Sequence, residues 1–398
     1  MGNIVDKLNK SPLFAMSKGS MELFHSNFWS WLINRIDKEY VLAFVKDIMI
    51  DFNNIKNTER EKKHTDILIN YGKQAIVIEN KIKSLPDKNQ LKKYEESIDK
   101  KFYFGVCVYP CDFEDDIILE NWSFITYDEI LNGIERITIK NKQKLLDNFD
   151  TNGKFYYDLI CEYVDMTRNV IEIIKSQKEN ISNNIITSED VKEINQLGLA
   201  DIVKKINARI LFNFLRENLI ERYPEERYCY ACGFNHKKIT ISIRKIINTD
   251  ENGYILLGPQ LEEDNFRRTI HVTNKTLGIN KNKEDRDLLY EKLKGIYFDI
   301  EEKNSKYNYP IVKKEAKLYN EYNGYYEEKD HNLLDQEYIA IYRYYKINNT
   351  SFEYILKLFE EELEYVSKIV DDKELINKIK LNTVKKTKIM LADEALIN

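Results

Sequence analysis

Two carboxylates and a lysine, placed at the ends of two short apolar runs, are the residues of this sequence best suited to chemistry. Asp66 precedes the first run, and Glu79 and Lys81 close the second, beyond a turn that contains Gly72. Alternate side chains of a strand share one face, so Glu79 and Lys81 point the same way, about 7 Å apart. If the two runs pair around Gly72 as a hairpin, Asp66 comes to lie beside Glu79. The sequence therefore predicts two converging carboxylates with an ammonium group next to them.

This arrangement suits the metal-assisted hydrolysis of a phosphodiester. Mg²⁺ prefers oxygen ligands, and one or two carboxylates suffice because the ion keeps several of its waters. The expected ligands are Asp66, Glu79 and the backbone carbonyl of Asn80, with Mn²⁺ as a substitute ion. The cation would polarise a phosphoryl oxygen and lower the pKa of a water molecule. We expect Lys81 to orient that water or to neutralise charge that develops on the phosphate.

A second polar pair, Gln90 and Tyr94, follows on a helix that the pattern predicts over residues 87–99. Four positions apart, the two side chains share one face of that helix and can hold Lys81 or a substrate phosphate. Lysines in the same stretch are either a solvated helix face or the local positive charge that a phosphodiester needs beside a chain of net charge -5. The candidate nucleic-acid contacts are Lys83, Lys88, Lys92 and Lys93.

The elements that position these residues form a small α/β domain within residues 1–142. Apolar residues at helical spacing predict helices over 21–36 and 39–52. Alternating or continuous apolar runs bounded by turn residues predict strands at 65–70, 75–81, 101–110 and the start of 122–131, which runs on into a helix. The order of helix, hairpin, helix and strand is typical of an α/β fold.

Beyond residue 142 the pattern changes twice. Residues 143–222 are mostly helical and are expected to connect two lobes, with a polar linker or surface loop over 176–190. Residues 223–398 hold short β-like runs and an amphipathic helix over 351–370, which predicts an α+β domain with an antiparallel sheet. We expect this C-terminal domain to serve substrate recognition, sensing or oligomerisation, so that a homo-oligomer or an activating partner would form through it.

Composition places the chain among globular proteins. Hydrophobic residues make up 43% and aromatic residues 12% of its 398 positions, which excludes a disordered chain and favours more than one domain. No apolar run approaches the roughly 18 residues that span a membrane. The N-terminus lacks the apolar segment of a secretory signal, and the five cysteines, an odd number, favour reduced thiols. We therefore expect a cytoplasmic protein without a membrane partner.

Taken together, the motifs resemble those of the PD-(D/E)xK nuclease superfamily. Asp66 is followed after twelve residues by Glu79-Asn80-Lys81 and then by Gln90-x-x-x-Tyr94, which is similar to the helix of the RecB-like branch. The stretch 22–32, in which a glutamate precedes a His-Ser pair, resembles the first helix of a bacterial group in this superfamily. The resemblance covers roughly residues 20–130, and Thr65 stands where the family pattern has proline.

The resemblance implies a restriction-endonuclease-like core, in which helices flank a mixed sheet, and metal-dependent hydrolysis of nucleic acid. DNA is the implied substrate, although no residue separates DNA from RNA, and restriction or anti-phage defence is the implied role. The implied site comprises metal ligands at Asp66 and Glu79, a catalytic Lys81, an accessory metal ligand at Glu22, and supporting residues Gln90 and Tyr94.

Other interpretations stay open. The alternative function is a catalytically inactive or partner-gated nucleic-acid-binding protein that retains the nuclease fold. Cys229-x-x-Cys232 with His236 has the residue types of a zinc site, but the sequence lacks a second pair, and two buried thiols are the simpler interpretation. His25 is expected to orient Glu22 or to cap its helix rather than to bind metal.

Overall fold

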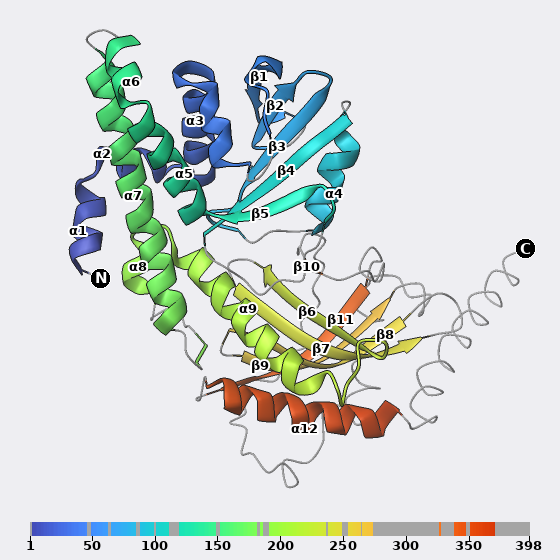
Figure 1. Cartoon of the computed structure of the whole chain (residues 1–398). Coiled ribbons are helices and arrows are strands. Elements are labelled where there is room, and N and C mark those ends of the chain that lie inside the picture. The colour runs from blue at the N-terminus through green and yellow to red at the C-terminus, as the bar shows by residue number, and fades with distance from the viewer. Residues whose placement is uncertain are drawn as a thin grey trace, which may run out of the picture. The chain divides into compact units, whose positions relative to one another are not determined.

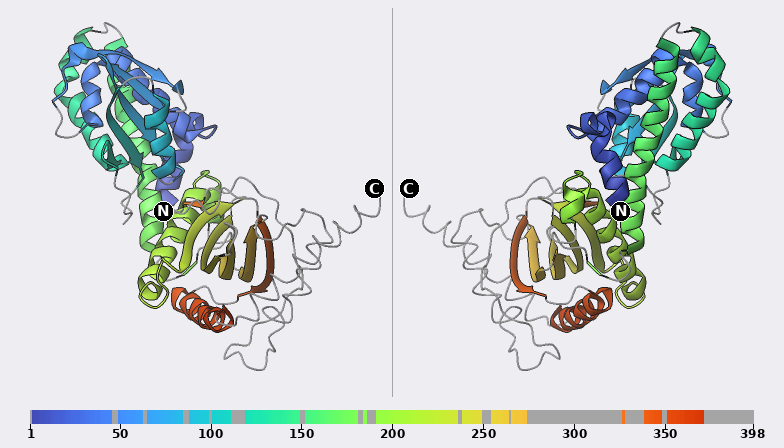
Figure 2. Two further views of the ribbon diagram at one scale, coloured as in Figure 1. Left: turned by 90° about the vertical axis from the view of Figure 1, so that its right-hand side faces the viewer. Right: turned by 90° about the vertical axis from the view of Figure 1, so that its left-hand side faces the viewer.

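The computed structural model divides the chain into two compact units, which are shown in Figures 1 and 2. The first unit comprises Met1–Ser182 and Val191–Lys205, and the second comprises Asn183–Asp190 and Ile206–Asn398. The domain boundaries predicted after residues 142 and 222 stay predictions. The structure describes residues 2–45, 49–62, 65–84, 88–98, 101–110, 119–148, 152–180, 184–185, 191–235, 238–248, 254–263, 265–273, 326–327, 338–347 and 351–370.

A mixed five-stranded sheet forms the centre of the first unit, in the order β1-β2-β3-β4-β5. The first three strands pair antiparallel, and β3, β4 and β5 pair parallel. This sheet confirms the predicted fold class. Its strands are β1 (Ile55–Arg60), β2 (Ile67–Tyr71), β3 (Gln74–Asn80), β4 (Lys101–Tyr109) and β5 (Trp122–Thr126).

The β2–β3 hairpin is the element on which the candidate site depends. Its turn contains Gly72, whose φ of 58° lies in the left-handed region that favours glycine. Ile67 pairs with Ile78, and nearly every position of the two strands is buried, as expected for continuous apolar runs inside a covered sheet. The two predicted strands are therefore confirmed, with small shifts at their ends.

Helices cover both faces of this sheet (Figure 1). On one face, Leu91 and Tyr94 of α4 and Ile98, which directly follows the helix, pack against the sheet residues Val77 and Cys107. On the other face lie α3 and α5, which contact β3 and β5. The helices of the first unit are α1 (Gly2–Lys10), α2 (Pro12–Ser17), α3 (Met21–Trp31), α4 (Lys88–Ser97), α5 (Tyr127–Lys140), α6 (Lys142–Asn148), α7 (Gly153–Asn180) and α8 (Lys192–Asn195).

Two predictions for the first unit are wrong. Instead of a helix over 39–52, the described residues form two short 3-10 turns, Lys38–Ala43 and Phe52–Asn54. Tyr40 and Val41 are fully buried in the first turn, so a compact turn produced the apolar spacing. The polar gap predicted over 176–190 begins inside α7, which continues to Asn180 although its last five residues, 176–180, are all polar.

The second unit contains an antiparallel sheet of six strands in the order β10-β6-β7-β8-β9-β11. Two helices accompany it: α9 (Ala200–Leu219), which begins in the first unit, and α12 (Phe352–Val370), which lies against β7 and β8. Both the antiparallel sheet and the final amphipathic helix were predicted. The strands are β6 (Tyr228–Asn235), β7 (Lys238–Asn248), β8 (Tyr254–Glu262), β9 (Asn265–Thr273), β10 (Tyr326–Glu327) and β11 (Tyr338–Lys346). Among the helices that the structure describes, none is long and apolar enough to cross a membrane.

Candidate nuclease active site

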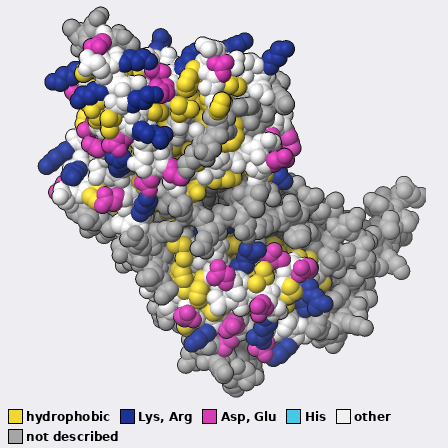
Figure 3. All heavy atoms as spheres, viewed as in Figure 1, with side chains coloured by type: hydrophobic (Ala, Val, Ile, Leu, Met, Phe, Trp, Pro, Cys, Tyr) yellow, Lys and Arg dark blue, Asp and Glu magenta, His cyan; other side chains and the backbone are white. Residues whose placement is uncertain are grey.

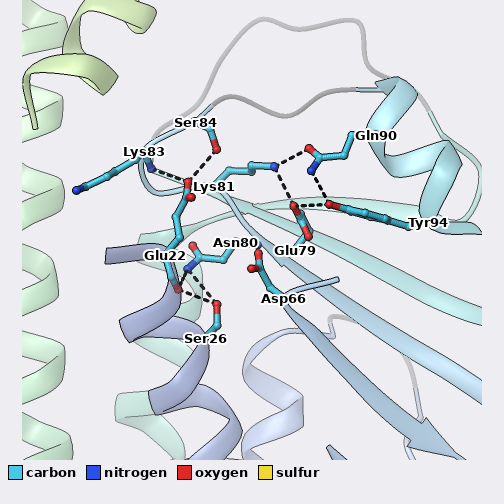
Figure 4. A network of polar contacts seen from close by, with 10 residues as sticks. All are labelled: Glu22, Ser26, Asp66, Glu79, Asn80, Lys81, Lys83, Ser84, Gln90 and Tyr94. Atoms are coloured by element: carbon cyan, nitrogen blue, oxygen red, sulfur yellow. Dashed lines mark hydrogen bonds and ion pairs between the residues drawn. The ribbon is translucent and has the colours of Figure 1, made fainter. Parts of the chain in front are cut away.

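Asp66 and Glu79 lie opposite each other at the end of the β2–β3 hairpin (Figure 4). This placement follows from the register, since Ile67 pairs with Ile78 and the next step brings the two carboxylates together. The backbone N–H of Asn80 donates to Oδ2 of Asp66 at 2.6 Å. The hairpin alone therefore brings the two acidic side chains side by side.

A closed ring of four polar side chains lies beside this pair (Figure 4). Nζ of Lys81 is 2.8 Å from Oε1 of Glu79 and donates to Oε1 of Gln90 at 2.7 Å. Gln90 donates to the hydroxyl of Tyr94, which in turn donates to Oε1 of Glu79 at 3.2 Å. Gln90 and Tyr94 reach the strand because α4 packs its apolar side on the sheet. The ammonium of Lys81 is thus oriented from two sides.

Burial strengthens the electrostatic interactions in this site. Glu79 is 3% exposed and Lys81 is 7% exposed. Burial and then the neighbouring Glu79 raise the pKa of Asp66 to about 8. Burial alone would lower the pKa of Lys81, but the adjacent Glu79 carboxylate outweighs burial and the pKa is raised, so this lysine stays an ammonium. The pair of carboxylates is therefore a place where a further cation would be strongly favoured.

The two acidic residues fit a hard divalent cation. Oε2 of Glu79 is buried and has no hydrogen-bond partner in the described part of the chain, which is costly unless a cation satisfies it. Among the described residues no group of three His, Cys, Asp or Glu side chains could hold a metal ion. A Mg²⁺-like ion suits such a sparse site, since it needs only one or two carboxylates and keeps its waters. The carbonyl of Asn80 is the backbone oxygen between Glu79 and Lys81.

Glu22 holds the turn that follows β3. Its Oε1 accepts hydrogen bonds from the hydroxyl of Ser84 at 2.9 Å and from the backbone N–H of Lys83 at 3.3 Å (Figure 4). Its backbone carbonyl accepts from the side-chain amide of Asn80 at 2.9 Å. The first turn of α3 thus positions the chain directly after Lys81. The predicted role of Glu22 as an accessory metal ligand stays a prediction.

Comparison with known proteins identifies this part of the chain. Residues 13–181 match the family model of the PD-(D/E)XK nuclease superfamily. This segment belongs to the PD-(D/E)XK nuclease superfamily. Comparisons with curated proteins and with solved structures gave no match. The matched residues contain the whole mixed sheet and the ring of polar side chains, and membership indicates a nuclease that uses divalent metal on a nucleic acid.

His25 is buried between helices of the domain that matches the superfamily, residues 13–181, which we call the superfamily domain. Its Nδ1 lies 2.7 Å from the hydroxyl of Tyr163, and the side chain is 1% exposed. Burial lowers the pKa of His25 to about 3, so the imidazole is neutral and shares a hydrogen bond with the tyrosine hydroxyl. The prediction that it orients Glu22 or caps the helix is wrong, because its hydrogen-bond partner is Tyr163 of α7 and the N-cap of α3 is Ser20.

The four lysines predicted to contact nucleic acid differ in exposure. Lys92 and Lys93 are exposed on α4, and Lys83 is partly buried in the turn after β3, while the side chain of Lys88 lies outside the described residues. On the face shown in Figure 3, basic side chains are interspersed with acidic ones. That face therefore shows no single broad basic patch among the described residues, and the role of these lysines stays a prediction.

Lys205, on α9, lies near the superfamily domain's site but was not predicted from the sequence. Its Nζ donates to the backbone carbonyl of Lys83 at 3.1 Å. Burial lowers the pKa of Lys205, and the nearby carboxylates of Glu22 and Asp201 counteract this effect. A contact across 122 positions leaves no local pattern, and in the sequence Lys205 is simply the second of two adjacent lysines in a helix.

In the described part of the second unit, no group of metal-binding side chains surrounds the Cys229-x-x-Cys232 motif. Cys229 is buried and Cys232 is partly buried in β6, and neither these thiols nor the buried Cys107 of β4 forms a disulfide. His236 and Cys111 lie outside the described residues.

Proposed function

We propose that the protein is a metal-dependent nuclease of the RecB-like branch that hydrolyses phosphodiester bonds of DNA with Mg²⁺. The observation that carries this proposal is the partnerless Oε2 of Glu79, which lies beside Asp66 while Lys81 is held at the other oxygen. DNA, and a role in restriction or anti-phage defence, rest on the resemblance to the superfamily. RNA is the alternative substrate, and the test below includes it.

In this proposal Lys81 acts as a fixed cation. Because Glu79 keeps its pKa raised, the ammonium donates hydrogen bonds and does not serve as a base. It would orient the attacking water and stabilise the charge that develops on the phosphate. Asp66, Glu79 and the Asn80 carbonyl would hold Mg²⁺, which when bound supplies Lewis acidity toward the phosphate and lowers the pKa of a water.

The surrounding residues would position the reactive groups and the substrate. Gln90 and Tyr94 are proposed to fix the orientation of Lys81 and Glu79, since each contacts the ion pair directly. Glu22 is proposed to hold the turn after β3, with metal contact as its further role. Phosphates of the nucleic-acid backbone would contact Lys83, Lys88, Lys92 and Lys93.

A cleavage assay tests the proposal. Supercoiled plasmid, linear DNA and single-stranded RNA are incubated with the full-length protein and Mg²⁺, Mn²⁺ or EDTA. Glu79→Gln and Lys81→Met keep the side-chain size, and each should slow cleavage at least about 100-fold. Lys73→Met, at an exposed position of the hairpin turn, is the matched control and should cleave like wild type.

Two results separate the alternatives. Metal-dependent cleavage that both site variants lose supports the nuclease. A folded wild-type protein that binds DNA but cuts neither DNA nor RNA with either metal would instead favour the inactive or partner-gated binding protein.

A further inference from the structure

One face of the second sheet is both polar and buried. On β9, Phe266 packs against Phe359 of α12, and Arg268 pairs with Glu362 of the same helix at 2.8 Å. The alternate side chains of β9 therefore point to the opposite face of the sheet. We call six polar residues of that side the polar face: Ser242, Arg244, Gln260, Arg267, Thr269 and His271. The same side also carries Leu256, opposite His271, and Glu262, which pairs with Arg267.

The polar face spans three neighbouring strands. Ser242 pairs with Gln260, and Gln260 pairs with Arg267, so these three form one row across β7, β8 and β9. In the next row Gly258 lies against Arg244: a Cβ there would be 3.0 Å from Cα and 3.3 Å from Cγ of the arginine. Gly258 therefore contributes no side chain to the centre of the polar face.

Arg244 is the central cation of this face. The residue is 1% exposed, its guanidinium lies 2.7 Å from Nδ1 of His271, and it donates to the hydroxyl of Ser242 at 2.6 Å. Burial, then Arg244, and then Arg267 lower the pKa of His271 well below its usual value, so both partners of Arg244 are neutral. Nε of Arg244 has no hydrogen-bond partner, and no carboxylate pairs with this guanidinium among the described residues.

The other arginines of β9 differ in this respect. Arg267 pairs with Glu262 at 2.5 Å, and Arg268 pairs with Glu362. A guanidinium removed from water is costly unless an anion and hydrogen-bond acceptors compensate it. Arg244 therefore needs an anion, which the described residues do not supply.

The chemistry of the polar face favours a phosphoryl group. The planar fork of a guanidinium matches phosphate oxygens in two parallel hydrogen bonds. The hydroxyl of Ser242 accepts from Arg244 and can donate its own proton to an anion, whereas the hydroxyl of Thr269 donates to the carbonyl of Gly258. A second guanidinium, Arg267, lies close enough to influence His271. Ser242 and Thr269 are fully buried, so the backbone of a nucleic acid, which requires exposed cations, does not fit this face. A ligand of this face would have to be small enough to be enclosed.

We propose that the polar face of the second sheet binds one phosphoryl group of a small ligand through Arg244. Inorganic phosphate and the phosphates of a nucleotide share this chemistry. The site is separate from the carboxylates of the superfamily domain, and the proposal does not require that the protein cleave nucleic acid.

Titration calorimetry of the full-length protein tests the proposal. Sodium phosphate and ATP are titrated separately in EDTA, at an ionic strength held constant with NaCl. We expect saturable binding of about one ligand per chain, weakened at least tenfold in Arg244→Lys. Lys238→Gln, an exposed cation on the same strand, should bind like wild type. Binding of ATP alone indicates a nucleotide ligand, and binding of both indicates recognition of the phosphoryl group itself.

A thermal measurement separates a ligand site from a merely structural arginine. Arg244→Met removes an uncompensated buried charge, so it should raise the Tm of the ligand-free protein, and phosphate should raise only the wild-type Tm. If Arg244→Met does not fold, Ser242→Ala serves in its place for the phosphate response. The proposal is overturned if folded wild type shows no saturable binding of either probe. It is also overturned if Arg244→Lys binds unchanged, or if a short DNA duplex, and neither small anion, depends on Arg244.

Discussion

The hydroxyl of Tyr94 donates to Oε1 of Glu79 across 3.2 Å. Lys81 pairs with the same oxygen, whereas Oε2 of this carboxylate has no partner in the described part of the chain. The protein thus holds one oxygen of Glu79 and leaves the other available to a cation. This division of one carboxylate between α4 and the proposed metal explains why a helix residue can affect a site at the end of a strand.

Removing the hydroxyl with Tyr94→Phe should have a modest effect. The hydroxyl donates to Glu79 and accepts from Gln90, so two hydrogen bonds are lost, but Lys81 still holds Oε1 of Glu79. We expect a loss of about 1–2 kcal/mol in transition-state stabilisation, or roughly five- to thirtyfold in rate. Single-turnover cleavage with Mg²⁺ measures it. A loss as large as that of Glu79→Gln would show that Tyr94 acts directly on the substrate.

Asp66→Asn should raise the Tm of the metal-free protein. The folded-state pKa of Asp66, about 8, is above its unfolded value, so its contribution is fully present below pH 3.8 and is lost as the pH rises through 8. The variant lacks this titration, and its Tm should therefore fall less than that of wild type between pH 5 and pH 8. Thermal scans in EDTA check this. Parallel curves for the two proteins would contradict the raised pKa.

Mg²⁺ should stabilise the wild-type protein and not Glu79→Gln. A ligand present at 100 times its dissociation constant adds about 2.7 kcal/mol to the free energy of unfolding. Because the ion would displace the proton of Asp66, binding should release protons near pH 7. Calorimetry in two buffers of different ionisation enthalpy detects that release. Equal stabilisation of wild type and Glu79→Gln would place the ion elsewhere.

Lys205→Gln tests the contribution of α9. The lysine contacts the carbonyl of Lys83 and lies outside the residues that match the superfamily, so we expect a positioning role. KM should rise about three- to tenfold with a small change in kcat, since the ring around Lys81 is intact. Lys205→Arg should recover most of the loss. A fall in kcat with unchanged KM would argue against this role.

The buried neutral His25 should make the protein sensitive to acid. Its folded-state pKa of about 3 is below the unfolded value of 6.5, so its contribution is present above pH 6.5 and is lost as the pH falls toward 3. Each such histidine contributes a slope of at most about 1.4 kcal/mol per pH unit. His25→Gln can still accept from Tyr163 and should flatten the dependence measured by urea unfolding at pH 4 to 7. An unchanged slope would show that His25 is not protonated on unfolding.

Local sequence patterns were sufficient to predict the strands that carry Asp66 and Glu79 and the helix that packs beside them. Continuous apolar runs around Gly72 predicted the β2–β3 hairpin, and a polar pair four residues apart predicted the face of α4 that meets it. These features depend on periodicity and turn chemistry, which a single sequence records. The antiparallel second sheet followed in the same way, whereas the mixed order of the first sheet was implied by the resemblance to the superfamily.

Features that depend on distant contacts were not predicted. Strand β1 has only two buried residues, Ile55 and Thr58, so its sequence shows no apolar run. The strand forms by pairing with β2. Lys205 reaches the turn after β3 only through tertiary packing. Arg244 looked like any strand arginine, because the missing carboxylate becomes evident only when its neighbours in space are known.

Asp66 and Glu79 belong to one hairpin, closed by a glycine turn, and not to distant parts of the chain. Hairpins form within about 1–10 μs, because only a short loop has to close. The two carboxylates therefore meet early in folding, while water still surrounds them and screens their repulsion. Packing of α4 and α3 later removes that water. A divalent cation that binds the hairpin before the helices pack would reduce the repulsion between Asp66 and Glu79, which burial later increases. We therefore expect divalent cations to assist folding of this domain.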